Sequence, residues 1–104
     1  MKVDFFIVGA MRSGTSSLRT QLDQDERICM AKGEPIWFSN DKKFNSGIDN
    51  YHEMFELNKK PSATIIGEKS PPYAVSTMAP KRVYEYNPNA KIINFYGCTE
   101  NSPR

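Results

Sequence analysis

The segment FIVGAMRSGTSSL, residues 6–18, has the composition of an anion-binding loop. Gly9 and Gly14 bound the loop, and hydroxyl side chains follow at positions 15–17. Backbone N–H groups in such a loop, and the N-terminus of the helix after it, attract negative charge. Arg12 adds a cation whose forked geometry suits phosphate or sulfate oxygens. The stretch therefore predicts a site for a phosphate or phosphosulfate group.

This loop differs from the nucleoside-triphosphate loop, G-x-x-x-x-G-K-[ST], at the position of the lysine. Thr15 stands there instead, and the cation has moved into the loop as Arg12. Triphosphate chemistry also uses Mg²⁺, and Glu68 is the one acidic residue that follows a predicted apolar strand. A terminal phosphate or phosphosulfate held without a metal fits better. A kinase-like enzyme using ATP and Mg²⁺ stays open as an alternative.

The pattern of apolar residues places the loop in an α/β fold. Apolar and β-branched runs predict buried strands over residues 3–8, 63–68 and 91–96. Apolar residues at helical spacing predict helices over residues 15–23, 47–57 and 76–86. This alternation favours a three-layer, P-loop-like fold in which a short parallel sheet is flanked by helices.

The segments between these elements are expected to be irregular. Residues 27–35 form a short stretch that ends in a Gly/Pro turn, and residues 36–44 are typical of a surface loop with aromatic anchors. Two prolines argue against regular structure over residues 69–73. The single histidine, His52, lies on the polar side of its predicted helix, where we expect it to contact solvent.

Length and charge limit the possible functions. The 104 residues suffice for one small domain, and a net charge of +2 does not predict nucleic-acid binding. Cys29 and Cys98 match no metal-ligand spacing and are expected to stay reduced. The apolar run over residues 5–10 is too short to span a bilayer and is a poor signal peptide. We therefore expect a cytoplasmic protein without a membrane partner, and we make no prediction of oligomeric state.

Four segments, in the right order, resemble sulfotransferases that use 3'-phosphoadenosine 5'-phosphosulfate (PAPS), above all the heparan-sulfate and bacterial branches. Residues 8–18, VGAMRSGTSSL, are similar to the family's 5'-phosphosulfate loop. Residues 32–38, KGEPIWF, are similar to a segment with a glutamate and two final aromatics. Residues 67–73, GEKSPPY, resemble E-K-[ST]-P-x-Y, and residues 86–93, YNPNAKII, resemble the lead-in to the family's third strand.

The resemblance implies an enzyme that transfers a sulfuryl group from PAPS to an acceptor hydroxyl, with a carbohydrate as one possible acceptor. The other product would be adenosine 3',5'-bisphosphate, and no metal is expected. The resemblance also implies which residues bind the donor: Arg12, Ser13, Gly14, Thr15, Ser16 and Ser17.

The same resemblance assigns catalytic roles. It implies that Glu34 is the general base and that Arg12 stabilises charge on the phosphosulfate. Lys69 is expected to contact the sulfate or the acceptor, and Glu68 to act as a second acid–base group or to hold Lys69 or Arg12 in place. Tyr73 is expected to line the acceptor cleft.

The resemblance ends in the last predicted strand. Gly97 stands where the family has an arginine, and the sequence stops at Arg104 before the serine that follows further on. In the family, that arginine and serine grip the 3'-phosphate of PAPS. We therefore expect a single, truncated sulfotransferase-like domain over residues 1–104 that holds the sulfate end of the donor. A non-catalytic domain that keeps the loop without turnover is a further alternative.

Overall fold

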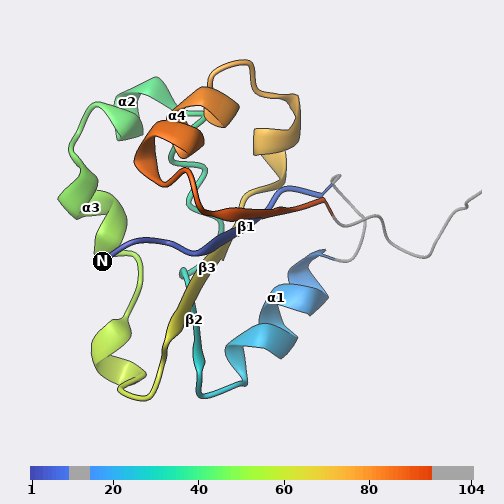
Figure 1. Cartoon of the computed structure of the whole chain (residues 1–104), viewed down its shortest axis with the longest axis vertical. Helices are drawn as coiled ribbons and strands as arrows, with labels where there is room; N and C mark the ends of the chain where they lie inside the picture. The colour runs from blue at the N-terminus through green and yellow to red at the C-terminus, as the bar shows by residue number, and fades with distance from the viewer. Residues whose placement is uncertain (10–14, 95–104) are drawn as a thin grey trace, which may run out of the picture.

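The computed structural model describes residues 1–9 and 15–94, with the side chains of Thr15 and Ser16 left out (Figure 1). Along these residues the strands are β1 (Phe5–Ile7), β2 (Ile28–Met30), β3 (Ile65–Lys69) and β4 (Lys91–Ile93). The helices are α1 (Thr15–Asp23), α2 (Asp41–Phe44), α3 (Ile48–His52) and α4 (Ala79–Tyr86). Two short 3₁₀ helices complete the set, η1 (Leu57–Lys59) and η2 (Pro71–Val75).

The described strands form one parallel sheet in the order β2-β3-β1-β4. Ile7, at the end of β1, lies in register with Lys69 of β3 on one side and Ile93 of β4 on the other. Parallel neighbours need crossover connections, and the helices supply them. The carboxyl ends of the strands therefore meet at one edge of the sheet, which is where open α/β sheets bind ligands.

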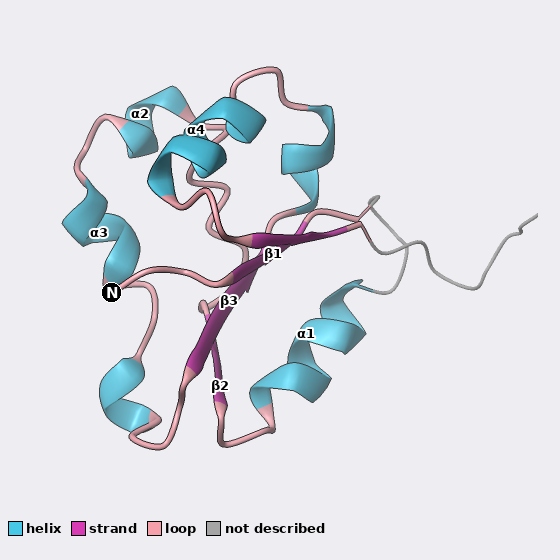
Figure 2. Ribbon diagram, in the orientation of Figure 1, coloured by secondary structure: helices cyan, strands magenta, loops and turns pink. Residues whose placement is uncertain are grey.

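Helices cover both faces of the sheet, so the predicted three-layer α/β arrangement is confirmed (Figure 2). α1 packs Leu18 and Leu22 against Phe5 and Ile7 on one face. The opposite face carries Phe6 and a larger core that reaches α3 and α4. Alternate residues of β1 thus serve different cores, because successive side chains of a strand point to opposite faces.

The predicted helix over residues 15–23 is confirmed, and the other predicted elements form in shortened versions. The strands predicted over residues 3–8 and 63–68 appear as β1 and β3. The strand predicted over residues 91–96 appears as β4, and residues 95 and 96 lie outside the described part. Pro80 is tolerated in the first turn of α4, where a backbone N–H would have no helical partner.

Four expectations were wrong. Residues 27–35 contain β2, a strand of three residues that is too short to show a period and that forms by pairing with β3. The surface loop expected over residues 36–44 contains α2 and buries Trp37 and Phe38, two of its three aromatic residues. The helix expected over residues 47–57 is confined to α3. Residues 71–75 form η2, because prolines at the start of a helical turn remove only N–H groups that have no partner there.

His52 also departs from expectation, since it is half-buried rather than fully solvated. Its Nε2 atom lies 2.9 Å from the hydroxyl of Tyr86, and that hydroxyl oxygen accepts a hydrogen bond from the backbone N–H of Val3. Partial burial lowers the pKa of His52 below its ordinary value. The polar side of the predicted helix therefore faces α4, an arrangement that depends on tertiary packing.

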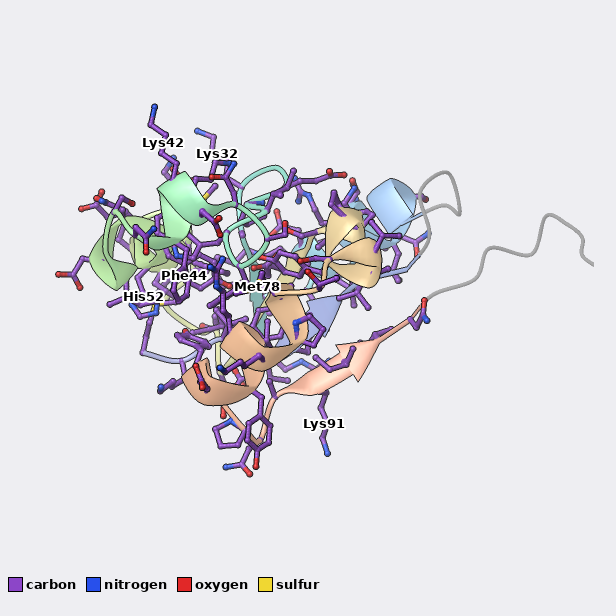
Figure 3. The ribbon with its side chains drawn as sticks, turned by 90° about the horizontal axis from the view of Figure 1, so that it is seen from above. Lys32, Lys42, Phe44, His52, Met78 and Lys91 are labelled. Atoms are coloured by element: carbon purple, nitrogen blue, oxygen red, sulfur yellow. The ribbon has the colours of Figure 1, made fainter. Side chains whose placement is uncertain are left out.

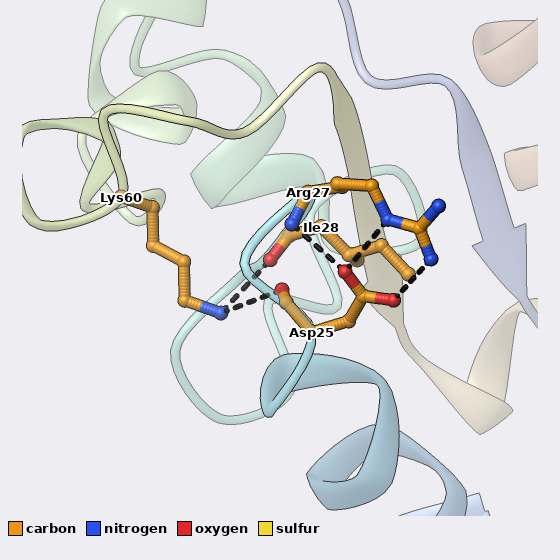
Figure 4. Close-up of polar contacts among 4 residues, drawn as sticks. All are labelled: Asp25, Arg27, Ile28 and Lys60. Atoms are coloured by element: carbon orange, nitrogen blue, oxygen red, sulfur yellow. Dashed lines mark hydrogen bonds and ion pairs between the residues drawn. The ribbon is translucent and has the colours of Figure 1, made fainter.

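Lys60 binds backbone carbonyls in the turn between α1 and β2 and so stabilises that turn (Figure 4). Its Nζ donates to the carbonyl oxygens of Asp23, Asp25 (3.3 Å) and Ile28 (2.9 Å). The last carbonyls of a helix have no helical partner, and a cation there is favoured by the helix dipole. Beyond it, Arg27 binds both carboxylate oxygens of Asp25, at 3.0 and 2.7 Å, and holds the pKa of that carboxyl well below its usual range.

We predict that Lys60→Met lowers the free energy of unfolding by about 1–3 kcal/mol, because hydrogen bonds to a charged group contribute on that scale. The substitution keeps most of the stem and removes the ammonium group. Urea denaturation followed by circular dichroism measures the loss. Lys59→Met is the matched control: this side chain is 68% exposed and pairs with Glu56 at 3.4 Å, so we expect less than about 1 kcal/mol. Equal losses in the two variants would contradict the role given to Lys60.

Candidate active site

Glu34 and Lys69 meet at the carboxyl edge of the sheet. The Nζ atom of Lys69 lies 2.5 Å from Oε2 of Glu34. The Lys69 side chain is only 4% exposed, whereas that of Glu34 is 37% exposed. Lys69 ends β3 and Glu34 follows β2, and these strands are parallel neighbours. The fold therefore combines a buried cation with a carboxylate that solvent can reach.

The start of the predicted anion loop lies at the same edge. Ile7 is paired in register with Lys69, and the backbone N–H of Ser70 donates to the carbonyl of Ile7 at 3.0 Å. Val8 follows the end of β1, and its N–H donates to the carbonyl of Ile93 of β4 at 2.8 Å. The chain thus enters the loop beside the residues that follow β3.

The loop residues themselves stay predictions as donor ligands. Arg12, Ser13 and Gly14 lie outside the described residues. Thr15 and Ser16 begin α1, but their side chains are not described. Ser17 is exposed in the first turn of α1.

Glu68 lies one residue before Lys69 and is completely buried. The hydroxyls of Tyr51 and Tyr73 donate to its Oε2, at 2.6 and 2.9 Å. The hydroxyl of Ser70 donates to its Oε1 at 2.6 Å. Burial removes water from this carboxylate and raises its pKa to about 7, against the opposing effect of the three hydroxyls. Glu68 is thus a satisfied interior acid rather than a surface ion pair.

The pattern of the sheet explains why Glu68 points inward. It is paired with Phe6 across β1 and β3, and Phe6 faces the larger core. Paired residues of a sheet share a face, so alternation along β3 could have predicted that Glu68 is buried. Tyr51 and Ser70 were missed as its partners. Tyr51 comes from a helix on another layer, and no local signal in the sequence connects it to β3.

Tyr73 is part of the buried core and also lines a surface hollow between α4 and β4. Its side chain is 4% exposed and its hydroxyl is directed toward Glu68. The hollow, of about 380 Å³, is also lined by Phe6, Val83 and Ile92. Neither Glu34 nor Lys69 lines this hollow. The expected role of Tyr73 in an acceptor cleft stays a prediction.

Comparison with known proteins finds similarity to sulfotransferases. Heparan sulfate glucosamine 3-O-sulfotransferase 5 from Homo sapiens is 30% identical over 87 residues, which are 84% of this chain. Bifunctional heparan sulfate N-deacetylase/N-sulfotransferase 1 from Xenopus laevis is 33% identical over 92 residues, also 84% of this chain. The crystal structure of a sulfotransferase from Alicyclobacillus acidocaldarius superposes with a TM-score of 0.73 and 30% identity over 88% of this chain.

The chain is homologous to sulfotransferases. It spans 25% of the length of the human relative, 10% of the Xenopus relative and 43% of the bacterial chain. No protein-family model matches it. This sulfotransferase homologue therefore shares its fold and sequence with one part of each relative.

Two features are absent from the described residues. No helix in residues 1–9 and 15–94 is long and apolar enough to cross a membrane. Within the same ranges, no group of three or more His, Cys, Asp or Glu side chains is arranged to hold a metal ion. The expected cytoplasmic location and the expected lack of a metal stay predictions.

The raised pKa of Glu68 predicts a pH-dependent stability. In the folded chain the carboxyl keeps its proton up to about pH 7, compared with an ordinary value of 4.5. Between these values the folded state binds more protons than the unfolded state, so stability falls as pH rises from about 4.5 to about 7. We expect this group to lower the free energy of unfolding by ~3 kcal/mol across that range.

Urea denaturation of the wild type and Glu68→Gln, at a series of pH values, tests this expectation. Glutamine has almost the same shape and does not titrate, so the decrease from this group should be missing in the variant. Parallel pH dependence in the two proteins would show that Glu68 does not titrate in this range.

Proposed function

We propose that this chain forms the sulfate end of the active site of a sulfotransferase, which moves a sulfuryl group from PAPS to an acceptor hydroxyl. The Glu34–Lys69 pair carries the proposal, because it lies at the sheet edge where β1 leads into the glycine-bounded loop. A buried ammonium at the edge where the chain enters that loop fits an anionic donor. Homology to sulfotransferases over most of the chain supports the same reaction class.

In this proposal PAPS supplies the activated sulfuryl group. Residues of the chain accept the proton of the acceptor hydroxyl and stabilise the negative charge that develops during transfer. The exposed part of Glu34 takes the proton of the acceptor hydroxyl as the new oxygen–sulfur bond forms and the bond from sulfur to the phosphate oxygen breaks. The ammonium of Lys69 supplies positive charge where negative charge develops. Arg12 contributes a second cation from the loop.

We further propose an anionic carbohydrate as the acceptor. The human and Xenopus relatives are named for heparan sulfate, which is such a polymer. In this chain, exposed Lys32 lies two residues before Glu34, and exposed Lys42 extends from α2 into solvent on the same side of the molecule (Figure 3). The neighbouring Lys43 donates to the carbonyl of Pro35 at 2.9 Å. Lys32 and Lys43 thus add positive charge to the segment that carries the proposed base.

Glu34→Gln should remove transfer while it preserves donor binding. Glutamine cannot accept the proton, and loss of a general base costs about 10²–10⁴ in rate. Transfer of labelled sulfate from PAPS to a heparan-type acceptor measures the rate, and calorimetry with adenosine 3',5'-bisphosphate measures binding. Glu53→Gln, at an exposed site after α3, is the matched control and should keep full activity. Retention of most of the rate in Glu34→Gln would exclude Glu34 as the base.

Arg12→Ala should weaken the binding of adenosine 3',5'-bisphosphate by about tenfold or more, because it removes a charge-assisted contact to the 5'-phosphate. Isothermal calorimetry compares the variant with the wild type and with Arg27→Ala, whose side chain is 76% exposed in an ion pair with Asp25. Equal affinities for wild type and Arg12→Ala would reject the assignment of Arg12. Binding of ATP with Mg²⁺, in place of the bisphosphate, would favour the kinase-like alternative.

A further inference from the structure

The segment that follows Glu34 has an unusual backbone conformation. Ile36 adopts φ = 50°, in the left-handed region that β-branched residues rarely enter. Such a conformation costs free energy and persists only where surrounding contacts determine it. Trp37 and Phe38, the next residues, are buried. Contacts outside the segment must therefore hold it in place.

Two hydroxyl groups supply these contacts. The Oγ atom of Ser70 accepts a hydrogen bond from the backbone N–H of Ile36 at 2.9 Å. The Oη atom of Tyr73 accepts from the N–H groups of Trp37 at 2.9 Å and of Phe38 at 3.2 Å. Three consecutive amides, starting two residues after Glu34, thus bind side chains that follow β3.

Glu68 determines the direction of both hydroxyls. A hydroxyl has a single proton to donate, and above about pH 7, where Glu68 is ionised, the protons of Ser70 and Tyr73 go to its carboxylate. Their lone pairs then face the amides of the segment. Tyr51 donates to the same carboxylate, and its ring packs against Trp37 and Phe38 with centroid distances of 5.4 and 5.1 Å. One buried acid therefore orients the acceptors of the three backbone hydrogen bonds and also binds the tyrosine that packs against Trp37 and Phe38.

We propose that Glu68 is a positioning residue for the Glu34 carboxylate, acting through Ser70 and Tyr73. The inference rests on the proposed function only in treating Glu34 as the general base. Glu68 itself is completely buried among these hydroxyls and does not face the reactants. Its part in the site is to keep residues 36–38 in the conformation that presents Glu34 to Lys69 and to the acceptor.

Amide hydrogen exchange, followed by NMR, tests whether Glu68 orders residues 36–38 through Ser70 and Tyr73, and it does not require turnover. Glutamine at position 68 offers one acceptor and one donor, so one side of the carboxylate site can no longer accept a hydroxyl proton. Measured above about pH 7, where wild-type Glu68 is ionised, Glu68→Gln should therefore speed exchange by about tenfold at Ile36, or at Trp37 and Phe38, which is the scale of one lost hydrogen bond.

Two further variants test the Ser70 and Tyr73 contacts one at a time. They also allow the test to be made if Glu68→Gln fails to fold. Ser70→Ala should speed exchange at Ile36, and Tyr73→Phe at Trp37 and Phe38. Tyr86→Phe is the matched control, since it removes another tyrosine hydroxyl of the same aromatic cluster, one that accepts from Val3 instead. The control should leave residues 36–38 unchanged. Wild-type exchange at these amides in Glu68→Gln, or in both other variants, would overturn the proposal.

Turnover provides the second readout. Tyr73→Phe and Glu68→Gln should lower kcat by about ten- to a hundredfold, the scale expected for a misplaced catalytic group, with KM for PAPS unchanged. Tyr86→Phe should retain kcat. A wild-type chain that neither binds adenosine 3',5'-bisphosphate nor transfers sulfate would reject the proposed function, and the exchange rates alone would then decide whether Glu68 orders the segment. Faster exchange with an unchanged kcat would overturn the positioning role.

Discussion

The burial of the Glu68 carboxylate is the constraint on which the rest of the site depends. A carboxylate taken out of water is costly unless hydrogen bonds replace its solvation. Here three hydroxyls do so, and they come from α3, from η2 and from the residue after β3. Each of these elements is tied to one point at the end of a central strand. The surroundings of Glu34 and Lys69 are fixed as a result.

The parallel sheet explains why the site forms at all. Three segments leave the carboxyl ends of adjacent strands: the loop after β1, the Glu34 segment after β2 and the Ser70–Tyr73 segment after β3. No two of them are close in the sequence. The sheet brings them together because its strands share one direction. An antiparallel β2 would have placed Glu34 at the opposite edge, away from Lys69.

Local sequence patterns were sufficient to predict the helices and strands that have strong periodicity or continuous apolar runs. α1 and the central strands β1 and β3 could be predicted, since their residues need little information from distant parts of the chain. β2 could not, because three residues in an edge strand acquire their conformation from pairing. The Glu34–Lys69 contact depends on that pairing. Glu34 itself was chosen through family resemblance, since nothing in its local sequence separates it from the other acids.

α1 illustrates how ligand and fold are connected. The core beneath it is small, with Phe5, Ile7 and Met30 as its buried residues in the described part. The helix begins where the predicted anion loop ends, so an anion bound there would act on the same helix as this thin apolar contact. By linkage, a ligand that prefers the folded state adds its binding free energy to the stability of that state. The donor would then serve as a structural component of the domain, and its concentration would set how much of the chain is folded.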